Sequence, residues 1–137
     1  MKRIIKFRGK DIKTGEFVFG DLETRPREDF MVIHQYNEDG SYRSQVKVDP
    51  DTVGQFTGLL DKNGREIYEG DLFRYEGDLF SLDGTMIMVV YEPENGYYCL
   101  RMSDSEYFML PLDRRFTDYY EVISNIYDHP ELLKTEE

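Results

Sequence analysis

Tryptophan, cysteine and long apolar runs are scarce in this sequence. It has no tryptophan and a single cysteine, Cys99, which cannot form a disulfide within its own chain. Cys99 lies in the apolar run Tyr97–Leu100, where a free thiol behaves as a small hydrophobic side chain, as suits a reducing cytosol. The longest apolar run, Met86–Tyr91, is far shorter than the roughly 18 residues that a membrane helix needs. Charges interrupt the N-terminus before a signal-peptide core could form, so we expect a cytoplasmic protein.

Histidine is also rare, and this restricts the chemistry. His34 and His129 stand far apart in the sequence, and with one cysteine they provide no zinc-ligand cluster. A serine or cysteine nucleophile needs a nearby base, and we interpret each histidine as a structural or surface residue instead. We therefore expect no catalytic residues, no cofactor and no metal. Paired-carboxylate hydrolysis depends on spatial separation that a sequence does not show, so it stays open.

Carboxylates are abundant, but their spacing does not match a calcium loop. The stretch Asp61-x-Asn63-Gly64 begins like an EF-hand loop, yet its glycine comes two positions early and Leu72 stands where the bidentate glutamate belongs. The other close pairs, Asp49 with Asp51 and Glu38 with Asp39, lie in expected turns, where such side chains bond their own backbone. A weak divalent-ion site remains the alternative.

Length and charge bound the organisation of the chain. Its 137 residues make one domain of ordinary size, which we place at residues 1–128 with a tail at 129–137. Two packed subdomains, 1–52 and 53–128, are the alternative. The net charge is −11, and because residues 1–10 carry five basic and no acidic side chains, the other 127 residues carry −16. Such acidity favours solubility or a basic partner and discourages non-specific nucleic-acid binding.

The pattern of apolar stretches and turns predicts an all-β, mostly β fold. Its centre is a hairpin in which Asp61-Lys62-Asn63-Gly64 joins Phe56–Leu60 to Arg65–Tyr68, with Gly64 at a left-handed turn position. Turn signals every 8 to 12 residues or so indicate a compact sandwich or an SH3-like barrel of short antiparallel strands joined by hairpins. The only helical candidate is one turn at Pro130–Lys134. The further strands that we expect are 3–8, 17–21, 30–36, 42–48, 72–75, 79–82, 85–91, 97–102, 107–110 and 119–126.

The phases of these strands predict one core. We expect the apolar sides or centres of the strands to bury ten residues: Ile5, Phe7, Phe56, Leu59, Ile67, Tyr68, Val90, Leu100, Val122 and Ile126.

The first expected strand also predicts a basic stripe. Lys6 and Arg8, with Lys10 beyond, point outward on one side of it. Small β-barrels bind single strands through aromatic platforms in positive grooves, so these three residues are the candidate nucleic-acid site. A basic edge strand that prevents edge-to-edge aggregation explains the same pattern.

Three stretches of the chain resemble the YopX family of small phage and prophage proteins. They are Ile5–Leu22, Thr52–Phe73 and Glu121–Leu133, in the family's order. The resemblance implies a mostly-β fold, a phage or prophage origin and a bacterial host cytoplasm. It brings no catalytic residues and no established role.

The leading hypothesis is a non-catalytic accessory protein that acts as a protein-interaction module or associates with itself. A nucleic-acid-associated module that uses Lys6, Arg8 and Lys10 is the alternative from another class. A small metal-dependent or paired-carboxylate enzyme is the third.

Overall fold

The computed structural model describes residues 2–77, 84–102 and 109–133. Across these residues the chain forms eleven β-strands in two antiparallel sheets, which confirms the mostly-β prediction. Both strand orders are open, so the described strands close no barrel. The chain divides into two compact units, Met1–Gly58 and Leu59–Glu137. Whether they fold as one domain or two stays a prediction.

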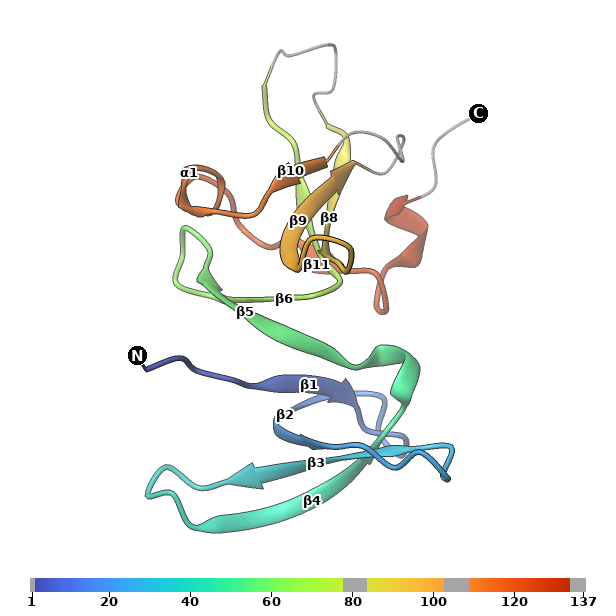
Figure 1. The fold of residues 1–137 in the computed structure, drawn as a ribbon. Helices are drawn as coiled ribbons and strands as arrows, with labels where there is room; N and C mark the ends of the chain where they lie inside the picture. Colours follow the sequence, from blue (N-terminus) through green and yellow to red (C-terminus); the bar gives the residue numbers. More distant parts are fainter. Residues whose placement is uncertain (1, 78–83, 103–108, 134–137) are drawn as a thin grey trace. The chain divides into compact units, whose positions relative to one another are not determined.

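The first unit contains five neighbouring strands in the order β4-β3-β2-β1-β5, all antiparallel where they pair (Figure 1). A short 3-10 turn, Pro50–Thr52, joins β4 to β5, and Asp49 caps it by accepting a hydrogen bond from the Asp51 amide. Val32, Ile33, Val48 and Phe56 are its buried apolar residues. The strands are β1 (Phe7–Lys10), β2 (Phe17–Glu23), β3 (Met31–Tyr36), β4 (Tyr42–Val48) and β5 (Gly54–Leu60).

Gly20 lets β2 and β3 approach one another closely. A Cβ atom built on Gly20 would overlap the carbonyl oxygen of His34 and would also press on Ile33. Strand β2 pairs with β1 up to Gly20 and with β3 from Asp21 onward, so this glycine stands where the strand exchanges partners.

The first strand differs from its prediction in length and phase. It begins at Phe7, four residues later than expected, and Ile5 is exposed, so its place in the predicted core is wrong. Arg8 is only 3% exposed, so the outward orientation predicted for it is also wrong. The physical reason is that the Arg8 guanidinium lies against the ring of Phe17 on the neighbouring strand β2, which covers it. Strand β1 is also paired on both sides, with β2 and β5, so it is not the edge strand of the alternative explanation.

In the second unit, the end of β5 and β6 (Glu66–Tyr68) form the expected central hairpin. The Asp61 amide donates to the Arg65 carbonyl, and Gly64 has a φ of 83°. This positive φ is the left-handed conformation that glycine adopts without strain, so the turn prediction is confirmed.

The second unit also contains a five-stranded sheet with the order β10-β9-β8-β7-β11. Its central pair is long and regular, running from Ile87 opposite Met102 to Glu92 opposite Tyr97. Its strands are β7 (Asp71–Arg74), β8 (Met86–Glu92), β9 (Tyr97–Met102), β10 (Met109–Pro111) and β11 (Ser124–Asn125).

A contiguous apolar cluster is buried in this unit. It consists of Ile67, Phe73, Ile87, Val89, Leu100, Met102 and Val122. Three of the ten predicted core residues belong to it, and Tyr68 and Phe56 are buried outside it. The others, Phe7, Leu59, Val90 and Ile126, are half-buried. Cys99 is buried too, and burial raises the pKa of its thiol, as suits a small hydrophobic side chain.

Two segments of the second unit differ from their predictions. The short helix α1 (Arg114–Thr117) was not expected from the sequence, and its Phe116 ring packs against Phe73 with centroids 5.2 Å apart. The predicted strand 119–126 is reduced to β11, because the Tyr120 carbonyl and the Val122 amide bond the central hairpin loop instead. The tail forms a 3-10 turn at Pro130–Leu133. The expected strand 79–82 and residues 107–108 lie outside the described residues.

Candidate functional site

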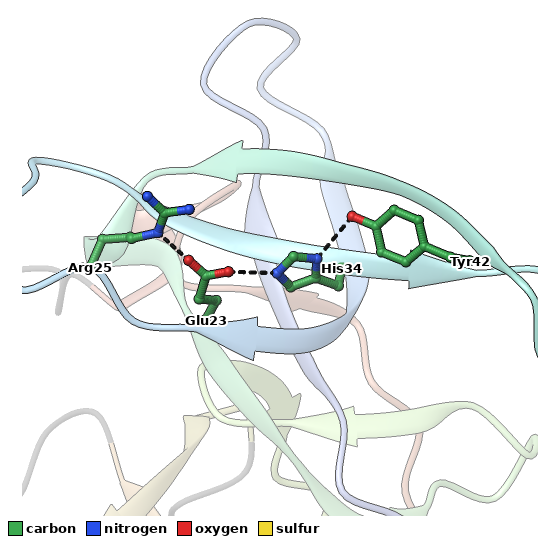
Figure 2. Close-up of polar contacts among 4 residues, drawn as sticks. All are labelled: Glu23, Arg25, His34 and Tyr42. Atoms are coloured by element: carbon green, nitrogen blue, oxygen red, sulfur yellow. Dashed lines mark hydrogen bonds and ion pairs between the residues drawn. The ribbon is translucent and has the colours of Figure 1, made fainter.

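Four polar side chains form a continuous row in the first unit (Figure 2). Glu23 lies on β2, His34 on β3, Tyr42 on β4 and Arg25 just after β2; we call these four residues the polar row. His34 Nε2 lies 2.8 Å from Glu23 Oε1, and His34 Nδ1 lies 2.9 Å from the Tyr42 hydroxyl. The other Glu23 oxygen accepts from Arg25 Nε in an ion pair. The histidine therefore links a carboxylate on one neighbouring strand to a phenol on the other.

Strand register explains why these residues meet. Across β2 and β3, Asp21 stands opposite His34 and Glu23 opposite Val32. Because side chains of opposed residues share a face and alternate along each strand, Glu23 and His34 point to the same side of the sheet. A register shift after Gln35 then sets Tyr36 opposite Tyr42.

The electrostatics of the row centre on Glu23. A hydrogen bond from His34 and then one from Arg25 hold the pKa of Glu23 below its ordinary value, against a smaller opposing effect of burial. The carboxylate is thus charged at neutral pH. In the neutral imidazole, Nε2–H donates a hydrogen bond to this carboxylate, and Nδ1 then accepts a hydrogen bond from the Tyr42 hydroxyl. Chemically, the row fixes the orientation of an imidazole and a phenol.

Two tyrosines lie at one end of the row. The rings of Tyr36 and Tyr42 meet edge to face with centroids 5.7 Å apart, and Tyr42 also lies 5.8 Å from the His34 ring. Both remain about half exposed, at 48% and 53%. Burial, followed by the charge of Asp21, raises the pKa of Tyr36, so its phenol stays neutral. This tyrosine end is aromatic, accessible and held in place.

A pocket lies toward the other end of the same strands. Its volume is about 550 Å³, within the range of small-molecule sites. Arg25 belongs both to the polar row and to this pocket. The lining residues are Asp11, Ile12, Lys13, Arg25, Phe30, Val32, Gln45, Val46 and Lys47.

The predicted basic stripe is folded against aromatic rings. Arg8 Cζ lies 4.4 Å and Lys10 Nζ 5.1 Å from the centroid of the Phe17 ring, and Lys6 Nζ lies 5.8 Å from that of Phe56. The structure thus brings Arg8 and Lys10 to one ring, where cation–π attraction holds them. Nucleic-acid binding by these residues stays a prediction.

Asp61, which begins the calcium-loop-like stretch, accepts hydrogen bonds from backbone amides of the protein. Asp61 is 6% exposed; one oxygen accepts from the amides of Asn63 and Arg65, and the other from the Val122 amide. Burial alone would raise the pKa of Asp61, but these three hydrogen bonds outweigh it and lower the pKa. In the part of the chain that the structure describes, no three histidine, cysteine or acidic side chains form a metal-binding group.

Two other residues considered in the sequence, Asp39 and His129, also contact neighbouring protein groups. Asp39 accepts from the amide and hydroxyl of Ser41, as the turn interpretation predicts. His129, in the second unit, lies 3.0 Å from Glu131 and is exposed, as a surface histidine would be.

The polar row is not predicted from the sequence, because the expected strand 17–21 ends before Glu23 and His34 is interpreted as a structural or surface residue. One signal was present: Asp21, Glu23 and Arg25 continue the two-residue period of β2, which would have set them on one face. Their meeting with His34 depends on register between strands, which the sequence does not give.

A family model described as YopX protein matches residues 6–134, nearly the whole chain. The chain belongs to the YopX family. Among solved structures, it is similar to the crystal structure of protein EF1440 from Enterococcus faecalis, with 24% sequence identity and a TM-score of 0.54. That match covers 97% of this chain and 100% of the other, and at this identity it shows the fold. No curated protein matches.

The YopX match spans both units and includes every member of the polar row. Among the described residues, no helix has the length and apolar character to cross a membrane.

Proposed function

We propose that this YopX protein is a non-catalytic accessory protein of phage or prophage origin that binds another protein in the cytoplasm of the bacterial host. Its contact surface is the tyrosine end of the β2-β3-β4 face. The observation that carries the proposal is the pair Tyr36 and Tyr42, which are half exposed yet held edge to face.

Tyrosine is enriched at protein interfaces because it offers a large apolar ring and a hydroxyl that can hydrogen-bond. Ordering a mobile side chain on binding costs roughly 0.5–1.5 kcal/mol. Tyr42 is already ordered by its hydrogen bond to His34 and its contact with Tyr36, which reduces that cost. The polar row thereby acts as the support of the contact surface.

Charge distribution also favours the first unit as the binding part. Residues 1–58 carry ten basic and ten acidic side chains and are formally neutral, whereas residues 59–137 carry seven basic and eighteen acidic ones. The whole net charge of −11 therefore belongs to the second unit. A neutral surface with fixed aromatic rings can be covered by a partner without bringing many like charges together.

Nucleic-acid binding through Lys6, Arg8 and Lys10 is the alternative function. Because Arg8 is buried, the number of these cations that can contact phosphates falls from three to two. The expected slope of log affinity against log salt concentration therefore becomes shallower, from about −2.7 to about −1.8. Two phosphate contacts supply little of the electrostatic affinity on which nucleic-acid binding at physiological salt depends. The third possibility, a small metal-dependent or paired-carboxylate enzyme, stays an untested alternative.

The test compares capture of partners by three forms of the protein. Immobilised wild type, the double variant Tyr36→Ser/Tyr42→Ser, and Tyr119→Ser are exposed to host lysate, and captured proteins are identified by mass spectrometry. Tyr119 is the matched control because it is 74% exposed and lies in the second unit. A captured partner is then purified and its affinity for each form is measured by calorimetry.

We expect wild type and Tyr119→Ser to bind the partner alike and the double variant to bind at least tenfold more weakly. Circular dichroism checks that the variant remains folded. Equal affinity of all three forms would contradict the proposed surface. A monomeric wild type that captures nothing would contradict the proposed function, and a partner identical to the chain itself would replace it with self-association.

A further inference from the structure

The pocket of the first unit is built from three separate segments. The turn after β1 supplies Asp11, Ile12 and Lys13, the connection between β2 and β3 supplies Arg25 and Phe30, and the sheet supplies the rest. The turn is fixed to the edge strand, because the Ile12 amide donates to the Lys47 carbonyl and Asp11 bridges Val48. These backbone contacts fix two walls of the pocket.

Cationic groups predominate in the pocket. The lining contains three cationic side chains, Lys13, Arg25 and Lys47, and one carboxylate, that of Asp11. The Asp11 carboxylate accepts a hydrogen bond of 2.8 Å from the backbone amide of Lys13, so it also stabilises the turn after β1. The formal charge of the lining is therefore +2 within a chain of net charge −11.

Arg25 is oriented by the polar row. Its Nε is paired with Glu23, and Figure 2 shows its two terminal nitrogens pointing away from that carboxylate. A planar guanidinium held in this way presents donors in a fixed direction, which suits the oxygens of a phosphate or carboxylate. The Glu23–His34 contact thus positions a charged side chain of the pocket.

Apart from the polar Gln45, the remaining lining is apolar and consists of Ile12, Phe30, Val46 and the buried Val32. Lys47 Nζ lies 4.5 Å from the centroid of the Phe30 ring. Val32 and Lys47 are opposed across β3 and β4, so apolar and cationic groups alternate over a short distance. A ligand that matches this lining needs both a negative charge and an apolar surface.

We propose that this pocket binds a small organic anion in which a phosphate or carboxylate group is joined to a flat apolar ring. Lys13, Lys47 and Arg25 contact the anionic group, and the ring lies against Phe30 and Ile12. The volume of about 550 Å³ accommodates a ligand of mononucleotide size or smaller. This site goes beyond the proposed protein-binding function and does not depend on it.

The test uses four matched probes on ¹⁵N-labelled full-length protein, followed by NMR amide shifts. Phenyl phosphate and benzoate carry the ring with different anions, benzyl alcohol carries the ring without charge, and inorganic phosphate carries the charge without the ring. For fragments of this size, a well-matched site gives dissociation constants on the order of 1–10 mM.

We expect phenyl phosphate or benzoate to shift the amide resonances of Ile12, Lys13 and Lys47. Its affinity should be at least fivefold higher than that of benzyl alcohol or inorganic phosphate. The stronger of the two anions distinguishes a phosphate site from a carboxylate site. Shifts confined to other regions, equal binding of benzyl alcohol, or no shifts at 10 mM would each overturn the proposal.

Charge substitutions provide the second test. The double variant Lys13→Gln/Lys47→Gln is expected to lower the affinity for the tighter-binding of phenyl phosphate and benzoate at least fivefold at low salt. Lys62→Gln in the second unit is expected to leave that affinity unchanged. The amide spectrum of the double variant shows whether it is folded. Unchanged affinity in a folded double variant would overturn the proposal. Tyr36→Ser/Tyr42→Ser is expected to retain probe binding, so failure of the protein partner and failure of the pocket are distinguishable.

Discussion

The two units of the chain are stabilised differently. The second unit contains a contiguous buried apolar cluster and a buried carboxylate, Asp61, that bonds three backbone amides. The first unit has fewer buried apolar residues, and much of its sheet face is occupied by the polar row and by cations lying on aromatic rings. The second unit also carries the entire net charge. The comparison indicates that packing concentrates in the second unit, whereas the first presents the polar and aromatic side chains that we propose as a contact surface.

The largest expected effect concerns the apolar cluster. Ile67 is fully buried, and Ile67→Ala should reduce the free energy of unfolding by about 2–5 kcal/mol, because it leaves a cavity in a packed interior. Denaturant titration followed by circular dichroism measures this loss. The control is Leu60→Ala, since Leu60 is 49% exposed and should cost far less. A loss below about 1 kcal/mol for Ile67→Ala would contradict the contrast between the two units, because the buried cluster would then not be what stabilises the second unit.

A second effect, somewhat smaller, concerns Asp61. Asp61→Ala leaves the amides of Asn63, Arg65 and Val122 without their acceptor, at a cost on the order of 2–4 kcal/mol. Asp39→Ala is the matched control, because Asp39 also accepts a local amide but lies in an exposed turn. Similar losses for the two variants would show that burial of Asp61 contributes nothing.

The pH dependence of stability sharpens this prediction. The pKa of Asp61 is lower in the folded protein than in the unfolded chain, where it is about 3.9. Its stabilisation is therefore fully present above about pH 5 and is lost as the pH falls through the lowered pKa. Wild type should lose this contribution in acid, and Asp61→Ala should not. Parallel acid profiles for the two proteins would contradict the assignment.

The smallest expected effect tests the polar row of the first unit. NMR titration of the Glu23 carboxyl should give a midpoint below its ordinary 4.5, and His34→Gln should move the midpoint upward, because it removes the largest cause of the shift. His129→Gln serves as control in the second unit. Because Glu23 has a lowered pKa, it stabilises the fold above its unfolded pKa, and this contribution is lost as the pH falls through the folded value. An unchanged midpoint in His34→Gln would show that the hydrogen bond from His34 does not lower the pKa of Glu23.

Local features of the fold were predictable from the sequence. Asn63-Gly64 between apolar runs located the central hairpin, because the turn is specified by residues next to one another. The single turn at the C-terminus followed from Pro130 in the same way. Alternation in Tyr42–Val48 gave the correct bounds of β4.

Features that depend on distant residues were not predictable. The alternation of its own strand predicts an exposed Arg8, but its burial depends on a residue distant in sequence, Phe17, whose ring lies against the guanidinium. Helix α1 has four residues, too few to show a 3.6-residue period, although Asp113 was available as its N-cap. The polar row required the register of three strands, and the pocket required a turn and a connection to meet the sheet edge.

Gly20 has a consequence for how substitutions in this chain would be interpreted. It has no side chain to contribute to any contact, yet adding one methyl group there would drive β3 away from β2 at His34. The spacing between Glu23 and His34 is therefore controlled by a residue that belongs to neither the row nor the pocket. A survey of tolerated substitutions would mark this position as essential, and that intolerance would report the distance between two backbones rather than a chemical role.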